Sequence, residues 1–145
     1  MHPYPHHYHV RATGQSTGVV AVSDANLSLP TQAPPEFGGP EGFWSPETLL
    51  VASVADCFVL SFRAIARASK LEWEQLDVPV EGILDRVDGV TRFVKFILRP
   101  RLVLRGAEHA SLAASTLDKA KRSCLITNSL NSECELAPEI DVLPA

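Results

Sequence analysis

Apolar and polar residues alternate along residues 8–29, and a Gly-Gln-Ser-Thr-Gly stretch at residues 14–18 interrupts the alternation. A period of two is typical of a strand with one buried face, and glycine-rich interruptions are typical of turns. The pattern therefore predicts a β-hairpin near the N-terminus. Residues 30–44 are rich in proline and glycine and are expected to form a loop.

A helix start follows this loop. Ser45 is a good N-cap residue, Pro46 suits the first helical position, and Glu47 places a carboxylate in the first turn. These signals predict a helix that runs from residue 46 to about Ser69.

Most of this predicted helix is apolar, and residues 49–68 are about as long as a membrane span. Asp56, Arg63 and Arg67 interrupt the stretch, however, and each would be costly inside a bilayer. We therefore expect no membrane contact and interpret the segment as the central, buried helix of a protein core.

The second half of the chain predicts strands, a helix and a last strand. Asp88-Gly89 separates two strand-like runs and indicates a hairpin turn, while Arg99-Pro100 indicates a bulge or an edge position. The expected elements are strands at residues 78–84 and 91–104, a helix at 107–122, a further turn or short helix that closes near Leu130, and a strand at 133–142. This order predicts an α+β fold, and we assign residues 1–145 to a single domain.

Composition narrows the function classes. The chain is 46% hydrophobic and 21% charged, with a net charge of −4, which is ordinary for a soluble protein and argues against a nucleic-acid partner. Three cysteines are too few for a disulfide-stapled scaffold, and no apolar signal segment opens the sequence. We therefore expect a cytoplasmic protein, in which a cysteine pair is more often redox-active than structural.

Cys57 lies in the middle of the predicted long helix. At about 100° per residue, it shares a face with small and apolar residues, which are Leu50, Ser53, Val54, Leu60, Ser61, Ala64 and Ala68. The thiol is therefore expected to be buried, and it has two interpretations, a small hydrophobic core residue or a redox thiol. Neither Arg63 nor Arg67 shares the face, so an activating group would have to come from another element or another subunit.

Cys124 has the same two interpretations. Ala113, Leu117, Ala120 and Cys124 form one apolar stripe on the second predicted helix. The third thiol, Cys134, lies in the last predicted strand, and we expect it to be structural. Helix periodicity alone does not decide between core and redox roles for Cys57 and Cys124.

Two motifs stand out in the sequence, the first at residues 35–42, 45–50 and 52–58, and the second at residues 119–130. Both resemble motifs of the OsmC/Ohr family, the osmotically inducible and organic hydroperoxide resistance proteins. The order of predicted elements is also similar over nearly the whole chain. The resemblance implies antiparallel sheets packed around a long central helix, and an intertwined homodimer with active sites at the subunit interface.

The resemblance also implies a chemistry. Cys57 would be the peroxidatic thiol, Cys124 the resolving thiol, and Glu47 the carboxylate that orients an arginine beside the reactive sulfur. A helix-start carboxylate that favours the helix dipole is the other interpretation of Glu47. The implied substrate is an organic hydroperoxide, with an external dithiol or lipoyl-type reductant and no bound cofactor.

The chain departs from the family pattern at two places. Neither residues 15–16 nor residues 31–35, where the family branches carry an arginine, contain one, and Leu125 follows Cys124 where proline is common. Substitute cations would be Arg11, Arg92 or Arg122.

The missing arginine motivates a second hypothesis, a non-catalytic dimer that binds a small hydrophobic or thiol-containing ligand. That hypothesis predicts a pKa of Cys57 that is unshifted or raised, whereas a peroxidase requires an acid-shifted thiol.

The N-terminal segment contains four histidines, His2, His6, His7 and His9. Prolines break this segment, and it has no cysteine or carboxylate partner at metal-ligand spacing. We therefore expect a frayed tail and no bound metal.

Overall fold

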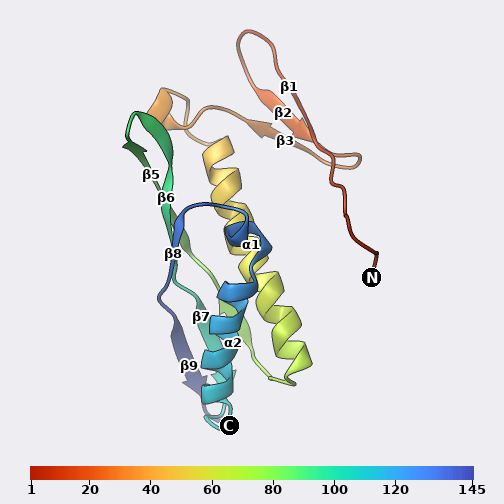
Figure 1. The fold of residues 1–145 in the computed structure, drawn as a ribbon, viewed down its shortest axis with the longest axis vertical. Coiled ribbons are helices and arrows are strands. Elements are labelled where there is room, and N and C mark those ends of the chain that lie inside the picture. The colour runs from red at the N-terminus through yellow and green to blue at the C-terminus, as the bar shows by residue number, and fades with distance from the viewer. The chain divides into compact units, whose positions relative to one another are not determined.

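A small antiparallel sheet organises the first of two compact units in the computed structural model, which describes residues 1–145. This unit comprises residues 1–50, and its strands β1 (Arg11–Thr13), β2 (Val20–Ser23) and β3 (Ser28–Thr31) pair in that order (Figure 1). The predicted hairpin is confirmed as β1–β2. The pattern did not predict β3, because Pro30 lies within it; β3 is an edge strand, where a residue without an N–H is tolerated.

Helix α1 (Pro46–Ala68) begins at the predicted residue. A short 3₁₀ turn, η1 (Pro35–Phe37), lies in the preceding loop. The backbone N–H of Thr48 donates to Ser45 Oγ at 3.1 Å, and the Ser45 N–H donates to Thr48 Oγ1 at 2.8 Å. This reciprocal pair is a capping box with threonine in the third helical position, and it satisfies two donors at the helix start.

The second unit comprises residues 51–145 and contains two three-stranded sheets. One sheet has the order β5-β6-β8, with β5 at Val80–Val87, β6 at Val90–Leu98 and β8 at Glu133–Leu136. The other has the order β4-β7-β9, with β4 at Gln75–Asp77, β7 at Arg101–Arg105 and β9 at Glu139–Leu143. The predicted α+β class is confirmed, and both sheets are mixed, because β8 and β9 pair parallel to their neighbours.

Three prolines lie at the boundary between these two sheets. Pro79 lies between β4 and β5, Pro100 between β6 and β7, and Pro138 between β8 and β9. Because proline has no N–H to donate to a ladder, prolines on three neighbouring strands interrupt the sheet across its width. We call this line the proline seam. The single strands predicted at residues 91–104 and 133–142 are therefore each divided into two.

Backbone hydrogen bonds still cross the proline seam. The Arg99 N–H donates to Pro79 O at 3.0 Å, and the Glu139 N–H donates to Pro100 O at 2.9 Å. The Ala137 N–H donates to Leu98 O at 2.8 Å. Pro79 and Pro100 thus act as acceptors, and the two sheets stay joined although the strands end.

The β5–β6 hairpin closes at the predicted turn. Asp88 and Gly89 have φ values of 51° and 78°. Two successive positive φ values are those of a type I′ turn, whose twist matches that of the flanking strands. The Asp-Gly prediction is therefore confirmed.

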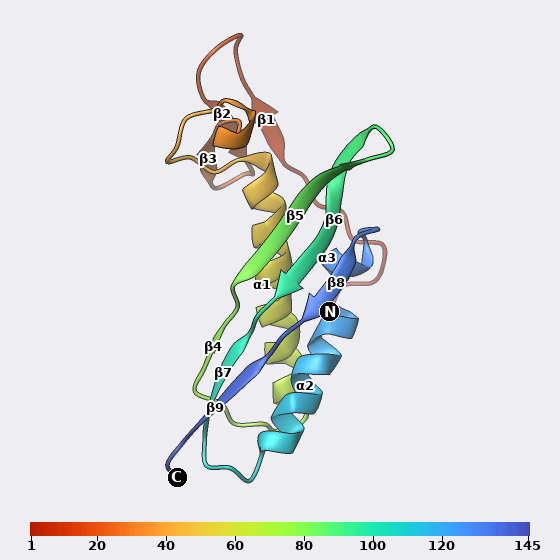
Figure 2. The ribbon, with the colours of Figure 1, turned by 90° about the vertical axis from the view of Figure 1, so that its left-hand side faces the viewer.

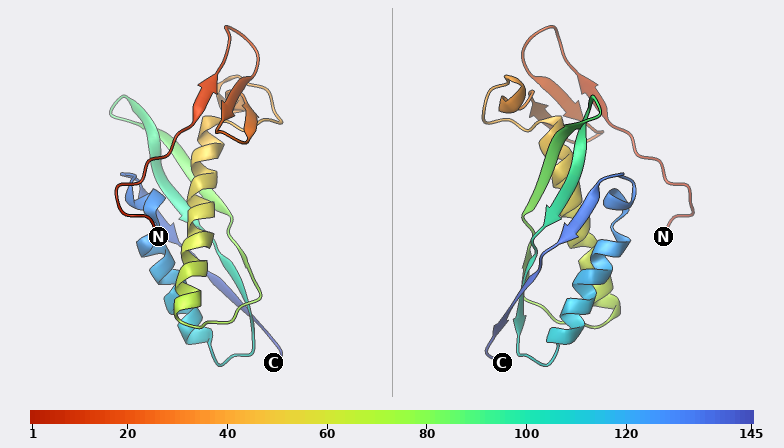
Figure 3. Two further views of the ribbon diagram at one scale, coloured as in Figure 1. Left: turned by 90° about the vertical axis from the view of Figure 1, so that its right-hand side faces the viewer. Right: turned by 60° about the vertical axis from the view of Figure 1, so that its left-hand side comes forward.

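Helices α2 (Ala110–Ser123) and α3 (Leu125–Asn128) and the part of α1 in this unit lie on one side of the two sheets (Figures 2 and 3). The core forms between the layers. It contains Val54, Phe58, Phe62 and Ala66 of α1, Phe96, Leu98, Leu102 and Leu104 of the strands, and Ala113, Leu117 and Ala120 of α2. The residues from α1 recur every four positions, so they form one stripe along the helix.

The rest of α1 is less enclosed than the sequence predicted. The helix is long and apolar enough to cross a membrane by length and composition, yet only Val54, Phe58, Phe62 and Ala66 are buried within it. We call the remaining apolar surface of this helix the open face of α1. Leu60 is 50% exposed and represents this face.

Gly82 in β5 marks a close approach between sheet and helix. A Cβ at this position would lie 2.6 Å from Val51 Cγ2 on α1 and 3.0 Å from Phe93 Cε1 on β6. The register of β5 against β6 shifts next to it, between Ile83 and Leu84. Glycine is required here by space, because any side chain would push α1 away from the sheet.

We expect Gly82→Ala to lower the free energy of unfolding by about 1–3 kcal/mol through overpacking. Val51→Ala removes the obstructing methyl groups, so the double variant should lose less stability than the sum of the single variants. Urea unfolding of the wild type and the three variants measures this. Additive losses would contradict the proposed contact.

Candidate functional site

Two cysteines that are distant in the sequence lie together in the second unit. The side chain of Cys57, in the middle of α1, is within hydrogen-bonding reach of the side chain of Cys124, between α2 and α3. Both are free thiols. The structure therefore brings together the two cysteines that the sequence singled out.

The local fold fixes Cys124. It is the C-cap of α2 and the N-cap of α3, with extended backbone angles of φ −66° and ψ 111°. Its predicted stripe is confirmed, since Ala113, Leu117 and Ala120 are buried and Cys124 is 1% exposed. The Asn128 N–H donates to Cys124 O at 3.0 Å, so the chain turns back into a helix directly after the cysteine.

This interruption leaves backbone donors free. The first N–H groups of any helix have no acceptor within that helix. Those of Leu125 and Ile126, at the start of α3, donate hydrogen bonds to the sulfur of Cys57. Ser61, one turn further along α1, places its Oγ 3.9 Å from the same sulfur.

These contacts decide the ionisation of Cys57. Burial is the largest single influence and raises its pKa, because a thiolate loses solvation. Hydrogen bonds from the Ile126 N–H, the Cys124 side chain, Ser61 and the Leu125 N–H act in the opposite direction. Together the bonds prevail, and the pKa of Cys57 lies below the ordinary value of cysteine.

No arginine contributes to this shift. Arg92 donates to the carbonyl of Phe93 at 3.3 Å, and Arg122 pairs with Asp118 at 3.1 Å. Arg11 is exposed on β1, in the other unit. The groups that lower the pKa of Cys57 are therefore uncharged donors, and none of the three substitute cations is among them.

The predicted burial of Cys57 is only partly correct. The thiol is half-buried, because the buried stripe of α1 passes through Val54 and Phe58, on either side of it. Cys57 instead borders the open face of α1, where Leu60 is exposed. A small molecule from solvent can thus approach Cys57 more readily than Cys124.

Glu47 lies in the first turn of α1, within the first unit. Its Oε2 atom is buried and has no hydrogen-bond partner. A buried, unpaired carboxylate oxygen is costly and calls for a donor. The predicted role of Glu47 in orienting an arginine stays a prediction.

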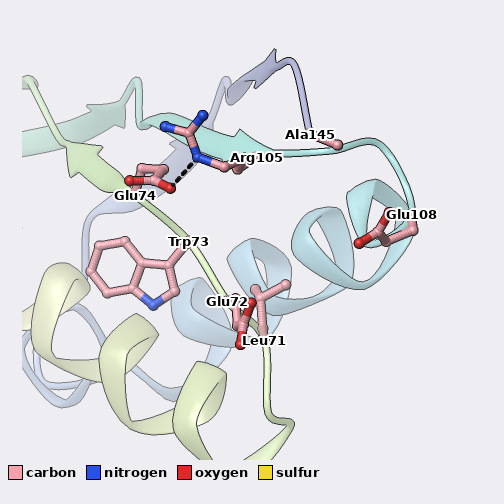
Figure 4. Close-up of a pocket in the computed structure, with 7 residues that line it drawn as sticks. All are labelled: Leu71, Glu72, Trp73, Glu74, Arg105, Glu108 and Ala145. Atoms are coloured by element: carbon pink, nitrogen blue, oxygen red, sulfur yellow. Dashed lines mark hydrogen bonds and ion pairs between the residues drawn. The ribbon is translucent and has the colours of Figure 1, made fainter.

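The hollow drawn in Figure 4 lies elsewhere in the second unit. It has a volume of about 610 Å³ and is lined by Leu71, Glu72, Trp73, Glu74, Arg105, Glu108 and Ala145. Arg105 is already paired with Glu74 at 2.9 Å and donates to Pro144 O at 3.3 Å. No cysteine lines this hollow. Nowhere in the chain are three or more histidine, cysteine, aspartate or glutamate side chains arranged to hold a metal ion.

Sequence comparison relates this chain to a known family. The profile of the OsmC-like protein family matches residues 38–139. An uncharacterised Bacillus subtilis protein, YmaD, is 30% identical over 142 residues, which cover 94% of this chain and 95% of that protein. An organic hydroperoxide resistance protein of Xanthomonas axonopodis pv. citri is 28% identical over 132 residues, which cover 88% of this chain and 89% of that protein.

Solved structures show the same fold. An OsmC-like protein of unknown function from Vibrio cholerae superposes with a TM-score of 0.82 at 22% identity, covering 94% of this chain and 99% of that one. An organic hydroperoxide resistance protein from Legionella pneumophila has a TM-score of 0.71 at 24% identity, with coverage of 92% and 97%. At these identities the likeness concerns the fold.

We expect Cys57 to become reactive at lower pH than Cys134, whose pKa is raised chiefly by burial. Alkylation by iodoacetamide from about pH 5 to about pH 10, followed by mass spectrometry, gives a midpoint for each thiol. Ser61→Ala removes one donor, so it should raise the midpoint of Cys57 by less than about one unit. Ser115→Ala, on the exposed side of α2, is the matched control. A midpoint of Cys57 at or above that of Cys134 would refute the assigned hydrogen bonds.

Proposed function

Because the chain belongs to the OsmC/Ohr family, we propose that it is a thiol peroxidase that reduces organic hydroperoxides. The proposal rests on one observation: the Cys57 and Cys124 side chains are within hydrogen-bonding reach, and the pKa of Cys57 is lowered. A peroxidase needs a thiolate that attacks and a second thiol within reach, and these two residues supply both.

The chemistry proceeds in two steps. The Cys57 thiolate attacks one peroxide oxygen, the O–O bond breaks, and the alkoxide leaves with a proton as the alcohol, so that Cys57 becomes a sulfenic acid. The Cys124 thiol then attacks the sulfenic sulfur, water leaves, and a Cys57–Cys124 disulfide forms. An external dithiol or lipoyl-type reductant returns the pair to the thiol state by exchange, without a bound cofactor.

The donors at the start of α3 serve the first step. The N–H groups of Leu125 and Ile126 hold the charge of the Cys57 thiolate before the attack. The break between α2 and α3 at Cys124 sets the position of these N–H groups, and the same break positions the resolving thiol of Cys124. Glu47 is proposed as a positioning residue whose free oxygen accepts from a cation in the assembled protein.

The preference for organic peroxides follows from the open face of α1. Leu60 lies half-exposed beside Cys57, and an apolar surface favours an alkyl group over water. The Xanthomonas relative is named for organic hydroperoxide resistance, which supports the same substrate class. The fold is that of a soluble protein, and we propose the cytoplasm as its location because thiol reductants are available there.

A non-catalytic binding protein for a small hydrophobic or thiol-containing ligand is the alternative. It requires a pKa of Cys57 that is ordinary or raised, because stable ligand binding needs no nucleophile. The lowered pKa of Cys57 favours the peroxidase.

We further propose a homodimer. Only four residues of α1 are buried within a single chain, so the apolar side chains on the open face of α1 stay uncovered in the monomer. A second copy that packs on this face would cover it and would border Cys57, consistent with a site at a subunit interface.

Peroxide consumption with dithiothreitol tests the activity. The wild type should consume cumene hydroperoxide faster than hydrogen peroxide, and Cys57→Ser should lose at least about a hundredfold in rate because the nucleophile is gone. Cys124→Ser should still form a sulfenic acid on Cys57, which dimedone captures. Circular dichroism confirms that the variants are folded. An inactive wild type, or an active Cys57→Ser variant, would refute the proposal.

Light scattering after size-exclusion chromatography tests the dimer. The wild type should have twice the 15.8 kDa mass of one chain. Leu60→Glu places a charge on the open face of α1, so it should weaken the dimer while leaving each chain folded. A wild type that runs with the mass of one chain at micromolar concentration contradicts the proposed assembly.

A further inference from the structure

Cys134 faces the same layer as the other two cysteines. Along β8, Glu133 and Glu135 are exposed whereas Cys134 and Leu136 are half-buried, so the thiol points to the inner side of the sheet. Its neighbour on β6 is Phe96, which is 1% exposed in the core. Helix α3 lies beside β8 (Figure 2).

Charges connect Cys134 with Cys124. Burial raises the pKa of Cys134 most, Lys121 in the last turn of α2 lowers it, and a charge on Cys124 raises it. Helix α3, which follows Cys124, lies beside β8 in Figure 2, and Cys134 is close enough to Cys124 for a charge there to change its pKa. Cys57 is within hydrogen-bonding reach of the same residue, Cys124.

The three thiols differ in their access to solvent. Cys124 is 1% exposed, while Cys57 and Cys134 are half-buried. A disulfide that ends in Cys124 thus has one sulfur hidden from an external reductant. Cys134 offers a partly accessible sulfur.

We propose that Cys134 is a third redox thiol, which receives the disulfide from Cys57 by exchange at Cys124. This step rests on the proposed function. The Cys134 thiol loses its proton to solvent and attacks Cys124 Sγ; the Cys57–Cys124 bond breaks, the Cys124–Cys134 bond forms, and Cys57 leaves as a thiolate. The exchange has no net oxidation, and the external dithiol then reduces the new disulfide.

The ionisation of the thiols sets the direction of this exchange. A thiol of lower pKa is the better leaving group, and Cys57 is stabilised as a thiolate by four hydrogen bonds. Cys134 has the higher pKa, so it is held better in a disulfide than as a free thiolate. Cys57 is thereby released to attack a second peroxide before the reductant arrives.

Ellman's reagent tests the exchange without a peroxide. At neutral pH it reacts first with Cys57, because the pKa of Cys57 is lowered and that of Cys134 is raised. Cys124 then displaces thionitrobenzoate from Cys57, and Cys134 should take over the disulfide. Trypsin separates the outcomes, because Cys57 lies in residues 12–63 whereas Cys124 and Cys134 share residues 123–145. After alkylation with iodoacetamide, transfer gives an alkylated 12–63 peptide and a 123–145 peptide with an internal disulfide. Without transfer, the two peptides stay cross-linked.

In the wild type we expect the internal disulfide in most molecules, and in Cys134→Ser only the cross-linked pair. Cys134→Ala serves if the serine variant does not fold. A wild type that keeps the cross-linked pair with Cys134 alkylated, or that forms neither disulfide, overturns the exchange.

A second arm with one equivalent of cumene hydroperoxide separates this inference from the proposed function. Transfer with Ellman's reagent but no thiol oxidation by the peroxide supports the exchange and refutes the peroxidase. Oxidation by the peroxide that stops at the cross-linked pair supports the peroxidase and refutes the exchange.

Discussion

The site depends on one break in a helix. If α2 continued through Cys124, the N–H groups of Leu125 and Ile126 would bond to carbonyls one turn earlier in α2. Because the backbone at Cys124 is extended, those donors are free and reach Cys57 on α1. The break also places the Cys124 thiol beside Cys57. One change of backbone angle thus supplies both the stabilised thiolate and its partner.

The surrounding layers hold the two helices in position. The α1 stripe of Val54 and Phe58 packs into the core of the second unit, as does the α2 stripe that ends at Cys124. Gly82 allows α1 to approach β5 closely. The β-ladders end at the proline seam, but hydrogen bonds across it keep the two sheets joined, so α1 and α2 pack against a continuous β-layer.

Much of this arrangement follows from patterns in the sequence. The cap at Ser45, the Asp88-Gly89 turn and the stripe that buries Cys124 depend on local chemistry and helical period, and the structure confirms them. The division of the long strands was not foreseen, because Arg99-Pro100 was interpreted as a bulge or an edge position. Which side of α1 is buried was also unclear, since most sides are apolar and only the packing partner decides.

The donors at Cys57 illustrate a further limit. A backbone N–H exists at every residue except proline, so a sequence does not indicate which ones are free. The sequence suggested Arg11, Arg92 or Arg122 as substitute cations, whereas the donors include the backbone N–H groups of Leu125 and Ile126. The sequence feature that indicates these free donors is the short helix predicted after Cys124, because the first N–H groups of a new helix have no acceptor within it.

Leu125 has one more consequence. A proline at this position would have no N–H, so leucine provides a donor that the Cys-Pro form of the motif lacks. A thiolate held by peptide dipoles at contact distance is not screened by dissolved ions as an exposed ion pair is. The lowered pKa of Cys57 should therefore persist in concentrated salt, in which the influence of an exposed arginine would be screened.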